Sequence, residues 1–257
     1  MSSENKEFYD LLNTITQEQT FSLELINGEA IQCKELTTSQ LKDLVKAVVD
    51  SPVTQAVFNT TASRVFESSI VSSAQSPLTT LDRTLFILQT RVNSLSPTIT
   101  ITSGDKQVTA DLTKIISDVK NTIKENSSLF ETKTTTVGKL ALTFGPPLLT
   151  AEQQMNVDYY KVNEEIDVQN VEELRKLIGE AFINEIAKTL RTLTIEEKTL
   201  DFSSVTFKSR IKTIESLPAA AVQEVIKYIE TYKKLIDECF VVDGVTVPVD
   251  GSLFSLR

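Results

Sequence analysis

Residues 21–34 have the sequence FSLELINGEAIQCK, which predicts a β-hairpin. Apolar residues at positions 21, 23 and 25 alternate with polar ones, as expected of a strand with one apolar face. Asn27 and Gly28 then supply the positive φ angles that a tight hairpin turn requires. The chain returns as a second strand that ends near Lys34.

A capping box directly after this hairpin predicts a helix. Thr37 and Gln40 hold its first and fourth positions, where each side chain can bond the backbone N–H of the other residue. The helix has an apolar face and ends at Ser51-Pro52. A second, more polar helix follows, and Thr79-x-x-Asp82 opens a third. We therefore expect a hairpin followed by helices in the first part of the chain.

Strand-like sequence follows Pro97. Residues 98–102 alternate threonine and isoleucine, and Ser103-Gly104-Asp105-Lys106 provides the turn to a returning strand. Residues 132–144 are again β-like, and Gly145-Pro146-Pro147 is the best candidate for a linker. The middle of the chain is therefore predicted to be a β-rich module with short helices.

Long helices and a last hairpin characterise the C-terminal part. Asn170-x-x-Glu173 caps the clearest helix, in which apolar residues recur at helical spacing from Val171 to Leu190. Short β-like pieces follow, the last of them at residues 205–207. Ser216-Leu217-Pro218 then opens a long final helix, and Asp243-Gly244 turns a terminal hairpin.

These elements together predict an α+β fold. It consists of an N-terminal β-hairpin followed by helices, a β-rich middle module, and long C-terminal helices closed by a terminal β-hairpin. We expect three consecutive domains: residues 1–95 with the hairpin and helices, 96–165 with the β-rich module, and 166–257 with the helical segment and terminal hairpin.

The amino-acid composition excludes most common catalytic sites. The 257 residues contain no histidine and only seven glycines, so a Ser-His or Cys-His pair, an imidazole-ligated metal and a glycine-rich phosphate loop are missing. A net charge of −9 without a basic stripe argues against nucleic acid as a partner. The 32 threonines favour strand edges, turns and helix caps. We expect no enzyme, and no catalytic, cofactor-binding or metal-binding residues.

The cysteines and the hydropathy of the chain favour a cytosolic protein. Cys33 and Cys239 match no C-x-x-C spacing, and we expect both to be free thiols. The charged N-terminus lacks the apolar region of a signal peptide. The longest uncharged run, residues 68–81, is too polar to span a bilayer, so we expect no membrane partner.

Acidic residues gather at Glu164-Glu165-Ile166-Asp167, Glu172-Glu173 and Glu196-Glu197. Paired carboxylates can split a glycosidic bond or hold a hard cation when the fold sets their separation. Neighbouring residues on a helix do not face one another, and acids in a first helical turn complement the helix dipole. We therefore expect a structural role for these residues, with a carboxylate-dependent cell-wall hydrolase as the alternative.

Apolar residues near the C-terminal hairpin are candidates for a protein interface. Val245, Val247, Leu253 and Phe254 follow a turn rich in Asp and Gly, and apolar residues in a tail need a surface to pack on. That surface is either a partner or the body of the same chain. If it is a partner, truncation after Phe240 weakens assembly more than folding.

Four segments, taken in order, resemble a known family. They are residues 35–41 (ELTTSQL), 80–91 (TLDRTLFILQTR), 214–218 (IESLP) and 243–254 (DGVTVPVDGSLF). With the Asn-Gly hairpin they make the chain similar to the baseplate hub subunits, or hub assembly proteins, of T-even-like contractile-tailed bacteriophages. Some relatives carry a C-x-x-C knuckle where this chain has the thiol-free turn at residues 103–106.

The resemblance implies a non-enzymatic tail protein that takes part in assembly of the central baseplate hub through protein–protein contacts. The implied partners are other hub proteins and the tape-measure protein. The implied location is the host cytoplasm during assembly, and the virion tail baseplate if the protein is retained. A structural component would be retained, whereas a transient assembly chaperone would leave, and both alternatives stay open.

Overall fold

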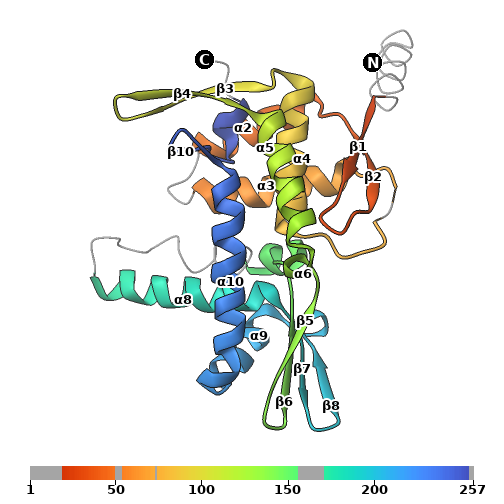
Figure 1. Cartoon of the computed structure of the whole chain (residues 1–257), viewed down its shortest axis with the longest axis vertical. Coiled ribbons are helices and arrows are strands. Elements are labelled where there is room, and N and C mark those ends of the chain that lie inside the picture. Colours follow the sequence, from red (N-terminus) through yellow and green to blue (C-terminus); the bar gives the residue numbers. More distant parts are fainter. Residues whose placement is uncertain (1–18, 50–53, 73, 156–170, 255–257) are drawn as a thin grey trace, which may run out of the picture. The chain divides into compact units, whose positions relative to one another are not determined.

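The computed structural model describes residues 19–49, 54–72, 74–155 and 171–254, and it confirms the α+β class (Figure 1). The chain divides into two compact units rather than three consecutive domains. Unit 1 comprises residues 1–76, 82–118 and 240–257, and unit 2 comprises residues 77–81 and 119–239. The boundaries expected at residues 95 and 165 do not coincide with those of the two units, because residues 240–257 group with the N-terminal elements.

Within the described residues, unit 1 contains three hairpins and three α-helices, together with the start of a fourth α-helix and a 3-10 helix. Its elements are β1 (Thr20–Glu24), β2 (Ala30–Lys34), α2 (Thr38–Val49), α3 (Thr54–Ser69), α4 (Thr80–Ser94), β3 (Thr98–Ser103), β4 (Lys106–Asp111), the first half of α5 (Leu112–Glu125), β9 (Val241–Val242), β10 (Val245–Thr246) and the 3-10 helix η2 (Gly251–Phe254).

The first hairpin and its following helix form where the sequence predicts them. β1 pairs antiparallel with β2, and Gly28 has the expected positive φ of +83° in the turn, whereas Asn27 does not have the positive φ that was also expected of it. In the capping box, the Thr37 N–H donates to Gln40 Oε1 at 2.9 Å and the Gln40 N–H donates to Thr37 Oγ1 at 3.3 Å. Asp82 at the start of α4 is buried, and its Oδ1 accepts a 2.8 Å hydrogen bond from the Ile26 N–H. The carboxylate thereby fixes the hairpin turn to α4.

The core of unit 1 is built on aromatic side chains from α3 and α4. The rings of Phe66 and Phe86 lie 4.9 Å apart between centroids, and Phe21 from β1 stacks on Phe86 at 6.0 Å. η2 packs against α2 from the far end of the sequence. The terminal hairpin is also tied to β4, because the Lys106 ammonium donates to the Asp243 carbonyl.

In its described residues, unit 2 contains a four-stranded sheet and helices, of which α10 packs on one face of the sheet. Its elements are the second half of α5, α6 (Ser127–Phe130), β5 (Lys133–Val137), β6 (Leu140–Phe144), the helical residues 149–155, α8 (Val171–Thr189), β7 (Leu190–Ile195), β8 (Lys198–Asp201), the 3-10 helix η1 (Phe202–Ser204), α9 (Phe207–Glu215) and α10 (Ala219–Cys239).

The sheet of unit 2 has the antiparallel order β5-β6-β7-β8, and its two faces differ in chemistry. Directly paired residues share a face. One face carries Leu142, paired with Leu193, and packs on α10, where the Tyr228 ring meets Phe144 edge-on at 5.3 Å. The other face is a solvent-accessible array of threonines: Thr134, Thr136, Thr143, Thr192, Thr194 and Thr199. Some of the 32 threonines of the chain therefore lie on this open face of the sheet.

Two local predictions need correction. Gly145, Pro146 and Pro147 are buried and hydrogen-bonded to distant backbone, so this segment is not a free linker: the Gly145 N–H donates to the Thr189 carbonyl at 3.0 Å, and the Thr80 N–H donates to the Pro147 carbonyl at 3.0 Å. The β-like residues 205–207 instead begin a helix, because the Thr206 side chain accepts from the Ser209 N–H and caps α9.

Candidate interaction surface

The four residues expected at a protein interface lie in the core of unit 1. Val245, Val247, Leu253 and Phe254 keep between 2% and 7% of their surface exposed. Buried side chains of this kind stabilise their own unit and present no area to a partner. The surface that could bind a partner therefore lies elsewhere, and the packing of the tail on its own chain is what the structure shows.

The structure describes only part of the acidic clusters. Glu164-Glu165-Ile166-Asp167 lies outside them, as does the cap residue Asn170. Glu196 is exposed at the turn between β7 and β8, where it forms a 2.7 Å ion pair with Lys139. In the part of the chain that the structure describes, no group of three acidic or thiol side chains is placed to hold a metal ion. None of the described helices combines the length and apolar character of a membrane span.

The two cysteines are free thiols in different surroundings. Cys33 in β2 is fully buried, and burial raises the pKa of its thiol from 9.0 to about 12. Cys239 at the end of α10 is half-buried, and its Sγ lies 3.4 Å from the Leu235 carbonyl. A thiol with a raised pKa is a poor nucleophile, so the environment of Cys33 favours a packing role.

Arginine side chains bind main-chain carbonyls, among them the buried Arg91 and Arg210 and the half-buried Arg191. Arg210 in α9 donates to the Ala187 carbonyl at 2.9 Å and to the Phe202 carbonyl at 2.6 Å, and its guanidinium lies over the Phe202 ring at 5.6 Å. Arg191 donates to the Thr189 carbonyl at 2.7 Å and to the Pro146 carbonyl, and burial lowers its pKa to about 10. The third, Arg91, belongs to unit 1. These donors stabilise turns and helix ends.

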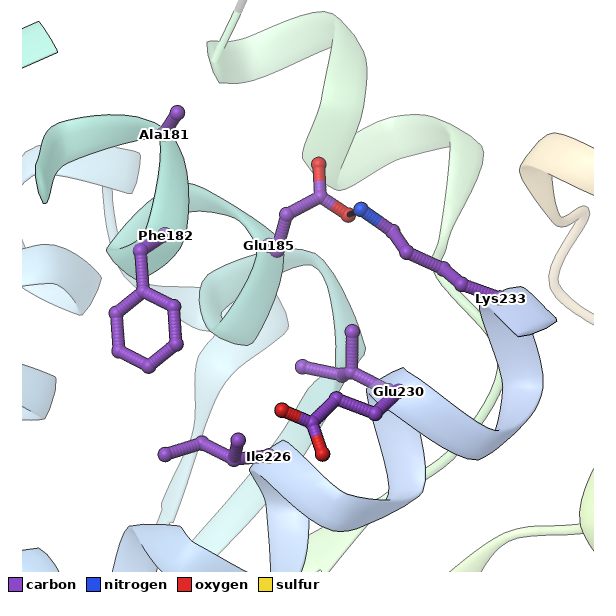
Figure 2. Close-up of a pocket in the computed structure, with 7 residues that line it drawn as sticks. Ala181, Phe182, Glu185, Ile226, Glu230 and Lys233 are labelled. Carbon is purple, nitrogen blue, oxygen red and sulfur yellow. Dashed lines mark ion pairs between the residues drawn. The ribbon is translucent and has the colours of Figure 1, made fainter. Parts of the chain in front are cut away.

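An apolar groove lies between α8 and α10, both within unit 2 (Figure 2). It has a volume of about 390 Å³ and is lined by Ala181, Phe182, Glu185, Ile226, Ile229, Glu230 and Lys233. Phe182 keeps 49% of its surface exposed beside the groove. Burying the exposed half of a phenylalanine, on the order of 100 Å², contributes about 2.5 kcal/mol. Phe182 is therefore a strong candidate anchor for a partner.

The charged residues of this groove are not equivalent. Glu185 Oε2 pairs with Lys233 Nζ at 2.9 Å, and Glu185 Oε1 pairs with Lys188. Burial alone would raise the pKa of Glu185, but the two ammonium groups outweigh it and hold the pKa below its ordinary value. Glu230 has no hydrogen bond or ion pair within the described residues, and Figure 2 shows it beside Ile226, facing the groove. The Glu185 carboxylate is thus neutralised by ion pairs, whereas the Glu230 carboxylate has no partner within the described residues.

A second exposed apolar patch lies at the tips of the two sheet hairpins. Val137 is 36% exposed and Ile195 is 50% exposed, and both lie on the sheet face that packs on α10 further along the strands. The two turns are joined by the Lys139–Glu196 ion pair and by a 3.2 Å hydrogen bond from the Glu196 N–H to the Lys139 carbonyl. The patch is therefore held on two linked turns and can keep its shape when it meets a partner.

Sequence reasoning predicted the helix that carries Phe182 but not the exposure of that side chain. Phe182 and Ile186 lie one turn apart on the same helix face, yet Ile186 is only 1% exposed. The spacing of the apolar residues identifies the apolar face of the helix, but it does not show which part of that face is covered by neighbouring elements.

Comparison of the chain with protein-family models, with curated proteins and with solved structures finds no match.

Proposed function

We propose that this chain is a non-enzymatic assembly protein that takes part in building the central hub of a contractile-tail baseplate through protein–protein contacts. The observation that carries the proposal is the half-exposed Phe182 beside the α8/α10 groove. Exposed aromatic side chains next to an apolar depression are typical anchors of protein interfaces. The resemblance of four segments to hub proteins supplies the particular assembly.

The groove is better suited to binding a protein surface than to a chemical step. Its walls are mostly apolar, and its most buried carboxylate, Glu185, is held ionised by two lysines. A general acid requires the opposite, a carboxyl whose pKa is raised by its surroundings. The surroundings of Glu185 therefore favour a fixed charge at the rim of an interface.

Co-expression of the full chain with individual hub proteins and with the tape-measure protein of the same phage tests this function. We expect a stoichiometric complex with at least one of them by size-exclusion chromatography with light scattering. Phe182→Asp should abolish it. Val71→Asp is the matched control, because Val71 is exposed to a similar degree (54%) but lies in unit 1. The proposal fails if the wild-type chain remains uncomplexed with every partner.

Mass spectrometry of purified virions separates the two roles that remain open. Stoichiometric presence in the tail baseplate identifies a structural hub component. Presence in the host cytoplasm during assembly, with absence from the virion, identifies a transient chaperone. Both outcomes require complex formation, so the co-expression experiment comes first.

A further inference from the structure

We propose that the α8/α10 groove receives an amphipathic helix of the partner, and that a lysine or arginine of that helix pairs with Glu230. The inference rests on the proposed function, because it assumes that the groove is a site of protein assembly. It adds the secondary structure of the bound segment and the sign of its charge.

The shape of the groove favours a helix. Its two walls are the helices α8 and α10, which contact one another within unit 2, and Figure 1 shows α8 crossing α10. A depression of about 390 Å³ between two helices holds a few side chains of a third helix laid on it. Apolar residues at positions i, i+3, i+4 and i+7 would cover Phe182 and Ile226 while the opposite face stays in water.

The charges of the groove favour a basic helix. Lys233, the lysine among the residues that line the groove, pairs with Glu185, as does Lys188, so this lining cation already has a carboxylate partner. Glu230 is the lining carboxylate that has no partner in the described part of the chain. An incoming lysine or arginine would pair with Glu230, whereas an incoming glutamate would meet its repulsion.

Long basic side chains also suit the apolar rim. The methylene groups of lysine or arginine can lie along Phe182 and Ile226 while the charged end reaches a carboxylate. Glu230 is one turn from Ile226 on α10, so both can contact the same side chain. The groove thus complements a segment that alternates apolar anchors with basic residues.

A synthetic peptide tests the inference directly on the full chain. The probe is a fluorescein-labelled helix of 14 residues made of leucine and lysine, with leucine at i, i+3, i+4 and i+7 of each repeat. The matched probe replaces every lysine by glutamate. In fluorescence-anisotropy titrations at about 0.15 M salt we expect saturable binding of the lysine peptide and at least tenfold weaker binding of the glutamate peptide.

Substitutions on α8 and α10 distinguish binding in the groove from attraction to the acidic protein as a whole. We expect Glu230→Gln to weaken binding of the lysine peptide about two- to fivefold, the range of an exposed ion pair, and Glu230→Lys to weaken it about tenfold. Phe182→Ala should weaken it at least tenfold. Glu224→Gln is the control, because Glu224 lies on α10, pairs with Lys227 at 2.7 Å and does not line the groove.

The inference is overturned if Glu224→Gln weakens binding as much as Glu230→Gln, or if both peptides bind equally well. Its failure differs from failure of the proposed function. If a complex with hub proteins forms equally well with Glu230→Lys, the assembly role is supported and the binding of a basic helix in the groove is rejected. Peptide binding that follows the variants, without any hub complex, supports the helix site and removes the baseplate role.

Discussion

The guanidinium of Arg91 in α4 donates a hydrogen bond from Nε to the main-chain carbonyl of Leu253, which lies 162 positions further along the chain. Its Nη1 donates to the Ser96 carbonyl at 2.6 Å. Arg91 is 8% exposed and Leu253 is 2% exposed, so both groups are buried. A single side chain therefore holds the end of α4, the following turn and the C-terminal 3-10 helix together.

Arg91→Ala should lower the free energy of unfolding by about 2–3 kcal/mol, because one buried and one part-buried carbonyl lose a charged hydrogen-bond donor. Urea unfolding followed by circular dichroism measures the change. Arg64→Ala is the control, since Arg64 is an exposed arginine of α3 in the same unit, and it should change stability by less than about 0.5 kcal/mol. Equal effects of the two variants would show that the Arg91 hydrogen bonds contribute nothing.

Phe254→Ala should lower the free energy of unfolding by about 3–5 kcal/mol, because it opens a cavity in the core of unit 1. Truncation after Phe240 should have a still larger effect, since it also removes the carbonyl that Arg91 binds. The structure thus predicts that the truncation strongly affects folding itself. A truncated chain that unfolds at the wild-type urea concentration would contradict this prediction.

Only Cys239 should react rapidly with an aromatic disulfide reagent at pH 8 in the native protein, and both thiols should react in denaturant. Cys33 is fully buried and its pKa is raised to about 12, so its thiolate is scarce. An unfolded thiol ionises above pH 9.0, whereas the folded one stays neutral to about pH 12, so this group's contribution to stability falls as the pH rises through that interval. Rapid labelling of both thiols in the native protein would refute the prediction that Cys33 is protected by burial.

Glu185→Gln should remove one cause of the fall in the free energy of unfolding at acidic pH. The folded pKa of Glu185 lies below its ordinary value, so the carboxylate stabilises the fold above the unfolded pKa of about 4.3, and this stabilisation is lost as the pH falls through the folded pKa. The gap in unfolding free energy between wild type and variant should therefore narrow from pH 6 to pH 3. A gap that stays constant over this range would exclude the ion pairs with Lys188 and Lys233 as its cause.

Two residues of β7 should respond very differently to truncation. Leu193→Ala should lower the free energy of unfolding by about 2–5 kcal/mol, because Leu193 is 5% exposed and pairs with the buried Leu142. Ile195→Ala should cost less than about 1 kcal/mol, because Ile195 lies on the same face but is 50% exposed. Thermal unfolding of the two variants measures both values. Similar losses would mean that the hairpin tips are covered in solution.

Local features were predictable from the sequence where the interaction partners are near neighbours. Gly28 and Gly244 adopt φ +83° and +78° in the turns that the Asn-Gly and Asp-Gly pairs indicate. Thr37 and Gln40 bond each other across one helical turn. Such features depend on residues a few positions apart, and their chemistry is visible in the sequence itself.

Features that depend on distant partners were not predictable. Gly145-Pro146-Pro147 has the composition of a linker, and only its contacts with Thr80, Thr189 and Arg191 bury it. The apolar residues at 245, 247, 253 and 254 require a surface to cover them, but their sequence does not say which one. For Phe182, periodicity identifies the helix face, whereas exposure depends on how far the neighbouring helix extends.

The discontinuous make-up of unit 1 sets an order for events during protein synthesis. Residues 19–118 emerge from the ribosome first, but the side chains of Leu253 and Phe254 that complete their core emerge only after all of unit 2. At the usual 5–20 residues per second, the intervening residues take on the order of ten seconds to make. During that interval the apolar surface of α2 that η2 later covers is open to the cell, and nascent chains on neighbouring ribosomes can meet through it.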